Sequence, residues 1–247
     1  MIADCHMHPV STDDLNDARR HGVSLFLCAA TRPDDYDAVL TFAKECPDVV
    51  PFIGTHPWYA DGHDAVVLEK LLQETPSAGI GEIGLDGKKG QKTQTAVFKE
   101  QLLLAARFNR PAVVHCVKAM SLLAPVLKTI SPLPVMMFHA FSGDKNDIRF
   151  LSGFDVYFSL NAAHAAKFPD LLANIPPDRL LFDSDAPFMR PKDGLCVSPR
   201  PQNAPANISL TVRSAAEILK TPQKELEERT TANARRFLAC LKEKNDD

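Results

Sequence analysis

The stretch from Ala78 to Asp86 reads AGIGEIGLD, an apolar run that carries Glu82 near its centre and ends on a second carboxylate. Its length and composition predict a buried strand. Three glycines crowd around Glu82, which indicates backbone packed close to a neighbouring group. Because a lone carboxylate is costly to bury among apolar side chains, we expect Glu82 to have a strong partner. We interpret that partner as a pair of divalent metal ions whose other ligands come from elsewhere in the chain.

Similar strand-like runs recur on both sides of this stretch, and most are followed by a segment with helical spacing of apolar residues. The predicted strands cover residues 2–8, 23–30, 49–56, 78–86, 111–116, 134–141, 155–160 and 179–185. The predicted helices cover residues 33–46, 65–74, 93–108, 119–130 and 144–151, and two more at 208–219 and 222–242 end the chain. This alternation predicts an α/β protein, a (β/α)8 TIM barrel forming a single domain over residues 1–247 with extra C-terminal helices. A doubly wound open sheet is the alternative.

The positions of the polar residues favour the barrel. In a TIM barrel, functional side chains come from the C-terminal ends of several strands, whereas an open sheet gathers them at one switch point. Here polar residues end most of the predicted strands: His6, His8, His56, Glu82, His115, His139, Asp183 and Asp185.

The first strand carries two histidines in the order DCHMH, from Asp4 to His8. Because side chains on a strand alternate between its two faces, His6 and His8 are expected on one face and able to chelate one metal. Cys5 and Met7 are then expected to point the other way, toward the helices. A surface or core histidine pair is the alternative interpretation.

Two later strands end on single histidines, His115 and His139, each after a proline and an apolar run. One histidine at a strand end is more often structural, but two in consecutive units favour metal ligands. His56 is a candidate substrate contact at the end of the third strand. The other histidines, His21, His63 and His164, are expected to have no role, the first two being solvated.

The last strand ends on Asp183 and Asp185, which lie on one face. A helix cap or turn is the ordinary interpretation of such acids. We assign Asp185 to the metals because it lies further toward the mouth, and we expect Asp183 to support a ligating histidine or a backbone group from behind.

The resulting ligand set is too large for one tetrahedral site with an open position. It suits two divalent ions, Zn, Mn, Mg, Fe or Ni, bridged by Glu82. Such a pair activates a hydrolytic water, whose proton Asp185 is placed to accept, so that Glu82 and Asp185 are the candidate catalytic residues. The ligands are His6, His8, Glu82, His115, His139 and Asp185.

Taken together, these residues resemble the TatD-type metal-dependent deoxyribonucleases, a branch of the amidohydrolase superfamily. The resemblance runs in order from the first residues to about Asn203. It implies a TIM barrel, a two-metal centre with the ligands above, and phosphodiester hydrolysis on DNA ends. The matching segments are DCHMH (4–8), GTHP (54–57), GEIGLD (81–86), VH (114–115), HAFSG (139–143) and DSDAP (183–187).

The chain departs from the usual family pattern around these segments. Val117 replaces an arginine, Asp183 replaces a glutamate, and Ala204 stands where a glutamate commonly follows the asparagine. The loop from Gly87 to Gly90 replaces an aromatic residue and a longer loop. We therefore expect an intact metal centre with altered substrate surroundings, where other cations can contact phosphate: Lys88, Lys89, Lys118, Arg190, Lys192 and Arg200.

Composition and charge limit the possible partners and the expected location of the protein. A net charge of -3 argues against a broad basic surface for long nucleic acid. Six unpaired cysteines, no signal-peptide pattern and no long apolar run predict a reducing, cytoplasmic location without a membrane or an obligate protein partner.

Three alternatives to a nuclease stay open. The first is an amidohydrolase-type enzyme acting on a small amide, ester or lactone. The second is a phosphoesterase of the polymerase-and-histidinol-phosphatase type, whose closing Asp-x-His motif is absent because Asp185 is followed by Ala186. The third is a barrel that holds metal and only binds a partner.

Overall fold

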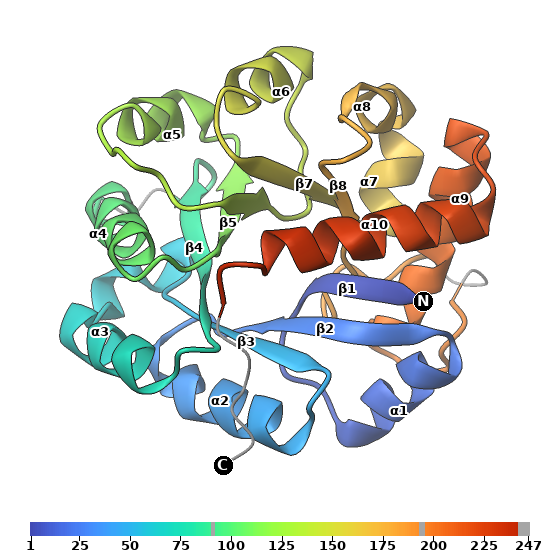
Figure 1. The fold of residues 1–247 in the computed structure, drawn as a ribbon, viewed down its shortest axis with the longest axis horizontal. Helices are drawn as coiled ribbons and strands as arrows, with labels where there is room; N and C mark the ends of the chain where they lie inside the picture. Colours follow the sequence, from blue (N-terminus) through green and yellow to red (C-terminus); the bar gives the residue numbers. More distant parts are fainter. Residues whose placement is uncertain (90–91, 193–195, 242–247) are drawn as a thin grey trace.

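The computed structural model describes residues 1–89, 92–192 and 196–241, and in this part of the chain eight parallel strands follow one another around a ring (Figure 1). Each strand pairs in parallel with the next. The barrel prediction is confirmed and the open-sheet alternative is wrong. The strands are β1 (Ile2–Met7), β2 (Val23–Ala29), β3 (Val49–Ile53), β4 (Gly79–Asp86), β5 (Ala112–Val117), β6 (Met136–Phe138), β7 (Val156–Leu160) and β8 (Leu180–Phe182).

The ring closes between β8 and β1 through residues that follow β8. The backbone N–H of Asp185 donates to the carbonyl of His6 at 3.0 Å, and that of His8 donates to the carbonyl of Ala186 at 2.7 Å. The seam of the barrel therefore lies at the position of three predicted site residues.

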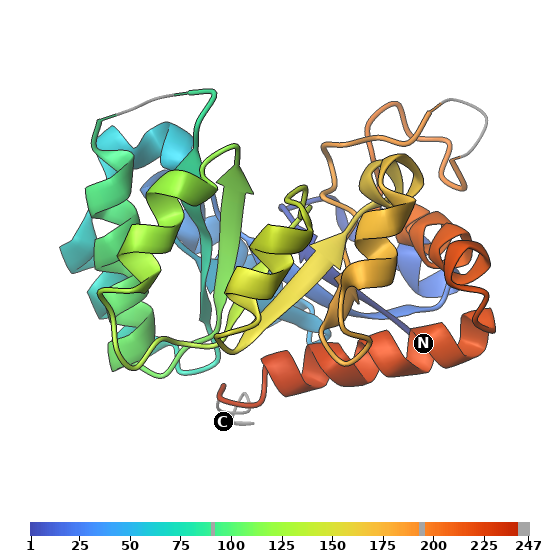
Figure 2. The same ribbon diagram turned by 90° about the horizontal axis from the view of Figure 1, so that it is seen from above.

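Helices surround the strands on the outside (Figures 1 and 2). No helix among the described residues is both long and apolar enough to cross a membrane. The helices are α1 (Thr12–Arg20), α2 (Tyr36–Glu45), α3 (Ala65–Glu74), α4 (Gln94–Arg107), α5 (Met120–Leu127), α6 (Lys145–Leu151), α7 (Ala162–Lys167), α8 (Pro169–Asn174), α9 (Ile208–Leu219) and α10 (Gln223–Phe237), with 3-10 turns η1 (Pro33–Asp35), η2 (Pro57–Gly62) and η3 (Pro205–Asn207).

Three of these helices, α1, α7 and α8, were not predicted from the sequence. In α1 only Leu15 and Ala18 are buried, so the apolar pattern that predicts a helix is weak there. Its start is instead fixed by a capping box between Ser11 and Asp14. The last helix, α10, ends earlier than expected, and the predicted end at Lys242 lies outside the described residues.

The floor of the barrel is formed by α10, which crosses beneath the N-terminal ends of the strands (Figures 1 and 2). Its residue Phe237 is fully buried and stacks on Phe52 of β3, with ring centroids 6.1 Å apart and planes 4° from parallel. Tyr157 of β7 meets the same ring edge-on at 5.7 Å. Aromatic side chains thus fill this end of the barrel.

One expected side-chain direction is wrong. Met7 packs in the layer between strands and helices as predicted, but Cys5 lies in the cluster that fills the barrel interior. The cause is a register shift in β1 between Asp4 and Met7. A second shift interrupts β4 between Ile80 and Ile83. Such bulges re-aim side chains next to active sites, and each of these two lies at a predicted ligand.

Replacing Phe237 by alanine tests the aromatic floor. Removal of this buried ring is expected to lower the free energy of unfolding by about 3–5 kcal/mol, the usual cost of a phenylalanine-sized cavity. Urea denaturation followed by circular dichroism measures the change. Phe237→Leu, which fills most of the space, is the control and is expected to cost less than half as much. Equal stability of the alanine variant and the parent would contradict a packed floor.

Candidate functional site

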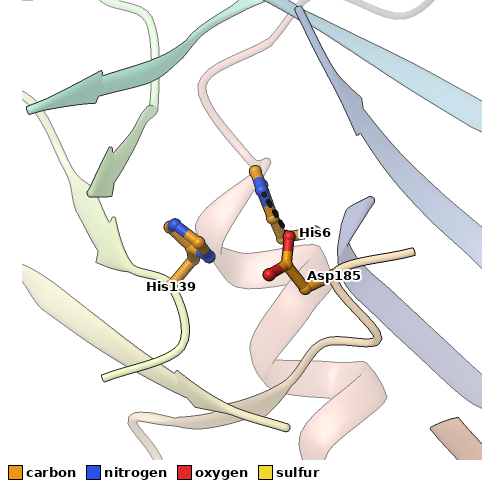
Figure 3. A group of neighbouring side chains, drawn as sticks. All are labelled: His6, His139 and Asp185. Carbon is orange, nitrogen blue, oxygen red and sulfur yellow. Dashed lines mark ion pairs between the residues drawn. The ribbon is translucent and has the colours of Figure 1, made fainter. Parts of the chain in front are cut away.

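The C-terminal end of the barrel gathers every predicted site residue into one buried cluster. Figure 3 shows three of them, from β1 and from the segments after β6 and β8, with their polar ends turned toward one another. The cluster contains His6, His8, His56, Glu82, His115, His139 and Asp185, with Asp183 beneath it, and all are buried.

Glu82 lies at the centre, and one of its oxygens faces the histidines of β5 and β6. Its Oε1 is 2.8 Å from His115 Nδ1 and 2.7 Å from His139 Nε2. His56 Nε2 lies 3.4 Å from the same oxygen.

The second oxygen of Glu82 faces the histidines of β1. Glu82 Oε2 is 3.4 Å from His6 Nε2 and 3.5 Å from His8 Nε2. Asp185 Oδ1 lies 3.7 Å from each of these two nitrogens. The carboxylate of Glu82 therefore separates two groups of imidazoles, one for each oxygen.

The glycines beside Glu82 allow β4 to lie close to β5, as the quoted stretch suggested. Gly84 has φ +145°, a conformation rare for residues with a side chain. A Cβ atom there would lie 1.9 Å from the carbonyl oxygen of His115, and one on Gly81 would lie 2.8 Å from Val113. The close approach of these two strands brings Glu82 and His115 into contact.

The electrostatics of the cluster favour positive charge next to Glu82. Burial alone would raise the pKa of Glu82, but His139 and His56 nearby and hydrogen bonds from His115 and His139 hold it well below its usual value. Burial lowers the pKa of His139, and the adjacent Glu82 reverses this and raises it to about 9. Burial, and then His139, lower the pKa of His6 to about 4, which keeps this imidazole neutral.

Several imidazole nitrogens in the cluster make no hydrogen bond and are therefore available to coordinate a metal ion. Among the described residues, both ring nitrogens of His6 and Nδ1 of His139 are buried without a hydrogen-bond partner. His8 Nδ1 donates to the carbonyl of Ala29 at 3.0 Å, which leaves its Nε2 directed toward Glu82. Donor atoms within 4.8 Å of one another form three groups: His6 with His139 and Asp185, His6 with His8 and Glu82, and His56 with Glu82 and His115. The donor set fits divalent cations.

Asp183 lies behind the cluster, where it was expected to hold a histidine or a backbone group. Its Oδ2 accepts the backbone N–H of Ala140 at 3.0 Å and the hydroxyl of Ser159. Burial is the main cause that raises the pKa of Asp183 to about 6. Since Ala140 directly follows His139, this carboxylate fixes the backbone that carries the histidine.

Asp86 and Trp58 also belong to this site and were not predicted from the sequence. The Trp58 indole N–H donates to Asp86 Oδ2 at 2.6 Å, and the same oxygen lies 3.4 Å from His115 Nε2. Asp86 therefore connects an aromatic residue of the rim to a histidine of the cluster. The sequence did contain a sign of both residues. Asp86 ends the quoted strand, and Trp58 follows His56 by two positions.

Two of the histidines that were expected to have no role, His63 and His164, are partly withdrawn from solvent. His63 is not solvated, because its Nδ1 lies 2.9 Å from Thr55 Oγ1 and its ring is nearly inaccessible. His164 is half-buried, and burial, followed by the influence of His139, lowers its pKa to about 4.

Two clefts open beside the cluster. The first, of about 480 Å³, lies between the loops after β4, β5 and β6 and helix α7, and carries Lys88, Lys118, Lys167 and His164. The second, of about 400 Å³, lies between the loops after β2 and β3 and carries Arg32, Asp34, Trp58, Tyr59 and Asp61. Of the other cations considered as phosphate contacts, Arg200 instead pairs with Asp14 at 2.9 Å, and Gly90 of the altered loop lies outside the described residues.

Sequence comparisons identify relatives of this chain. A family model described as TatD related DNase matches residues 3–239. The chain is 29% identical over 233 residues to the 3'-5' ssDNA/RNA exonuclease TatD of Erwinia tasmaniensis, with 89% of this chain and 90% of the relative covered.

Solved structures give the same fold. A TatD homologue from Escherichia coli K12 superposes with a TM-score of 0.86 at 25% identity, covering 96% of this chain and 97% of the other. A TatD-family hydrolase from Entamoeba histolytica superposes with a TM-score of 0.78 at 19% identity, covering 91% and 87%. The second likeness concerns the fold alone.

Proposed function

Since the chain belongs to the TatD related DNase family, we propose that it removes nucleotides from the ends of single-stranded DNA or RNA by hydrolysing phosphodiester bonds. The chain is a divalent-metal-dependent hydrolase of the nuclease type. The observation that carries the finer proposal is the position of Glu82, with an imidazole group at each carboxylate oxygen.

Two ions are the number that this arrangement supports. One would be held by His6, His8 and Asp185, the other by His115 and His139, with Glu82 shared between them. Neutral imidazole and carboxylate are ligands of Zn, Mn, Fe and Ni, and a bridging carboxylate is common in two-metal hydrolases. Loading would displace the proton that Glu82 now favours on His139, since a ligating imidazole must be deprotonated.

The bound ions would supply Lewis acidity and a water that is acidic near neutral pH. The residues around them have separate tasks. Asp185, at the edge toward the mouth, would accept the proton of the attacking water. His56 Nδ1 accepts the backbone N–H of Trp58 at 3.1 Å. The proton of a neutral His56 is therefore on Nε2, where it can be donated to a phosphate oxygen.

Metal content is the first expected result. Protein purified without chelator and offered Zn or Mn should contain close to two divalent ions per chain by elemental analysis. Chelation should lower the melting temperature, because ions that bind only the folded chain stabilise it by about 2.7 kcal/mol at a hundredfold excess over Kd. Apo protein reloaded with metal is the control. A metal content near zero after loading would contradict the centre.

An activity screen tests the substrate class. Metal-loaded protein is expected to release mononucleotides from short single-stranded oligonucleotides, with Mg, Mn and Zn compared in parallel. An amidohydrolase acting on a small amide, ester or lactone is the second candidate, and Val117 in place of the usual arginine favours it. The three lysines in the neighbouring cleft favour phosphate instead. Turnover of an acyl panel with no nucleotide release would reverse the ranking.

A further inference from the structure

The second cleft contains an aromatic surface that the proposed chemistry does not use. Trp58 and Tyr59 both line it and remain 40% and 38% exposed, unusual for large apolar side chains beside a buried centre. The cleft volume of about 400 Å³ is in the range of small-molecule sites.

Trp58 is held in a fixed orientation next to the metal ligands. Its indole N–H is fixed by Asp86 at 2.6 Å, and its ring meets the ring of His56 edge-on with centroids 4.9 Å apart. The Lys89 ammonium lies 3.5 Å from the ring centroid. An exposed aromatic ring that is already oriented loses little conformational entropy when a flat partner stacks on it.

The two clefts differ in charge, which indicates how a nucleotide chain would lie across the mouth. The first contains Lys88, Lys118 and Lys167, which suit phosphates. The second combines the aromatic rings with Asp34 and Asp61, which repel phosphate but can accept hydrogen bonds from the amino groups of a base.

We propose that Trp58, together with Tyr59, is the stacking platform for the terminal nucleobase of a single-stranded substrate, with the scissile phosphodiester over Glu82 and the following phosphates in the lysine cleft. This proposal rests on the proposed nuclease function. It predicts a preference for single strands, since a base paired and stacked within a duplex does not present its faces to a protein ring.

Intrinsic fluorescence can detect stacking of a base on Trp58 without turnover, because Trp58 is the only tryptophan in the sequence. Metal-loaded protein is titrated with a short oligodeoxyadenylate whose linkages are phosphorothioates that resist hydrolysis. Saturable quenching is expected. The same oligonucleotide with a terminal abasic nucleotide keeps all its phosphates and is expected to quench little.

Substitutions of Trp58 distinguish its stacking on a base from its hydrogen bond to Asp86. Trp58→Leu is expected to lower kcat/KM on single-stranded DNA about fivefold to a hundredfold, the usual effect of losing one base–aromatic stack, mainly through KM. The loss should be much smaller on the abasic-ended substrate, which has no terminal base to stack on the ring. Trp58→Phe retains a ring without the N–H and should recover most of the loss. Leu103→Ala, which removes a similarly exposed side chain on α4, is the matched control.

Each outcome decides between the two proposals. Base-dependent quenching without hydrolysis of any oligonucleotide supports the platform and overturns the nuclease. Hydrolysis with equal loss on normal and abasic-ended DNA, or a phenylalanine variant as poor as the leucine one, overturns the platform and leaves the nuclease. Absence of both quenching and hydrolysis overturns both.

Discussion

Glu82→Ala is expected to abolish nucleotide release while leaving the barrel folded. The substitution removes both oxygens that face the two imidazole groups, so each of the two proposed ions would lose a shared ligand. Because each ion contributes several kcal/mol of transition-state stabilisation, and about 1.4 kcal/mol corresponds to tenfold in rate, kcat/KM should fall about 10⁴-fold or more. Elemental analysis of the same preparation should show a metal content well below two per chain.

The controls for this substitution test what the carboxylate does. Glu82→Gln keeps the side-chain volume but has one carbonyl oxygen, and is expected to be nearly as inactive as the alanine variant. Glu74→Ala removes an exposed carboxylate from α3, and full activity is expected. Two bound ions and parental turnover in Glu82→Ala would refute the bridging role. If Glu82→Ala does not unfold cooperatively, Glu82→Gln takes its place in the comparison of activity and metal content.

The barrel was predictable because each strand of a parallel barrel is an apolar run followed by a helical pattern. The strand ends were not. Residues 134–141 and 179–185 appeared as long strands, yet β6 and β8 span only Met136–Phe138 and Leu180–Phe182. Beyond each strand the backbone turns into the left-handed region, with φ of 43° at Ala140 and 54° at Asp185. The periodicity of apolar residues in the sequence gives no sign of such turns. The turns nevertheless set the direction of the candidate metal ligands.

The candidate ligands were found from strand position and residue type, since a histidine or acid after an apolar run is conspicuous. The residues behind them were not found in the same way. Trp58 and Asp86 are 28 positions apart and meet only because β3 and β4 are neighbours. Cys5 points inward because of a register shift that leaves no signal in composition. Contacts between loops and irregularities within strands are properties of the folded chain.

Asp185→Asn is expected to lower kcat about 10²- to 10⁴-fold, the usual contribution of a positioned general base. Asparagine is a suitable replacement because Asp185 has φ 54°, a conformation that asparagine tolerates better than most residues. The backbone N–H that donates to the His6 carbonyl is unchanged, so the barrel seam should persist. The loss therefore reports the carboxylate rather than the fold.

The metal content of Asp185→Asn separates its two proposed tasks. Asp185 Oδ1 lies near both His6 and His8, so the amide should weaken one ion without removing it. Turnover is therefore measured at saturating metal, with occupancy checked by elemental analysis. If Asp185 accepts the proton, kcat stays low when both ions are bound, and KM for the oligonucleotide changes little. Recovery of parental kcat at high metal would mean that Asp185 acts only as a ligand, and the base would then have to be another group at the mouth.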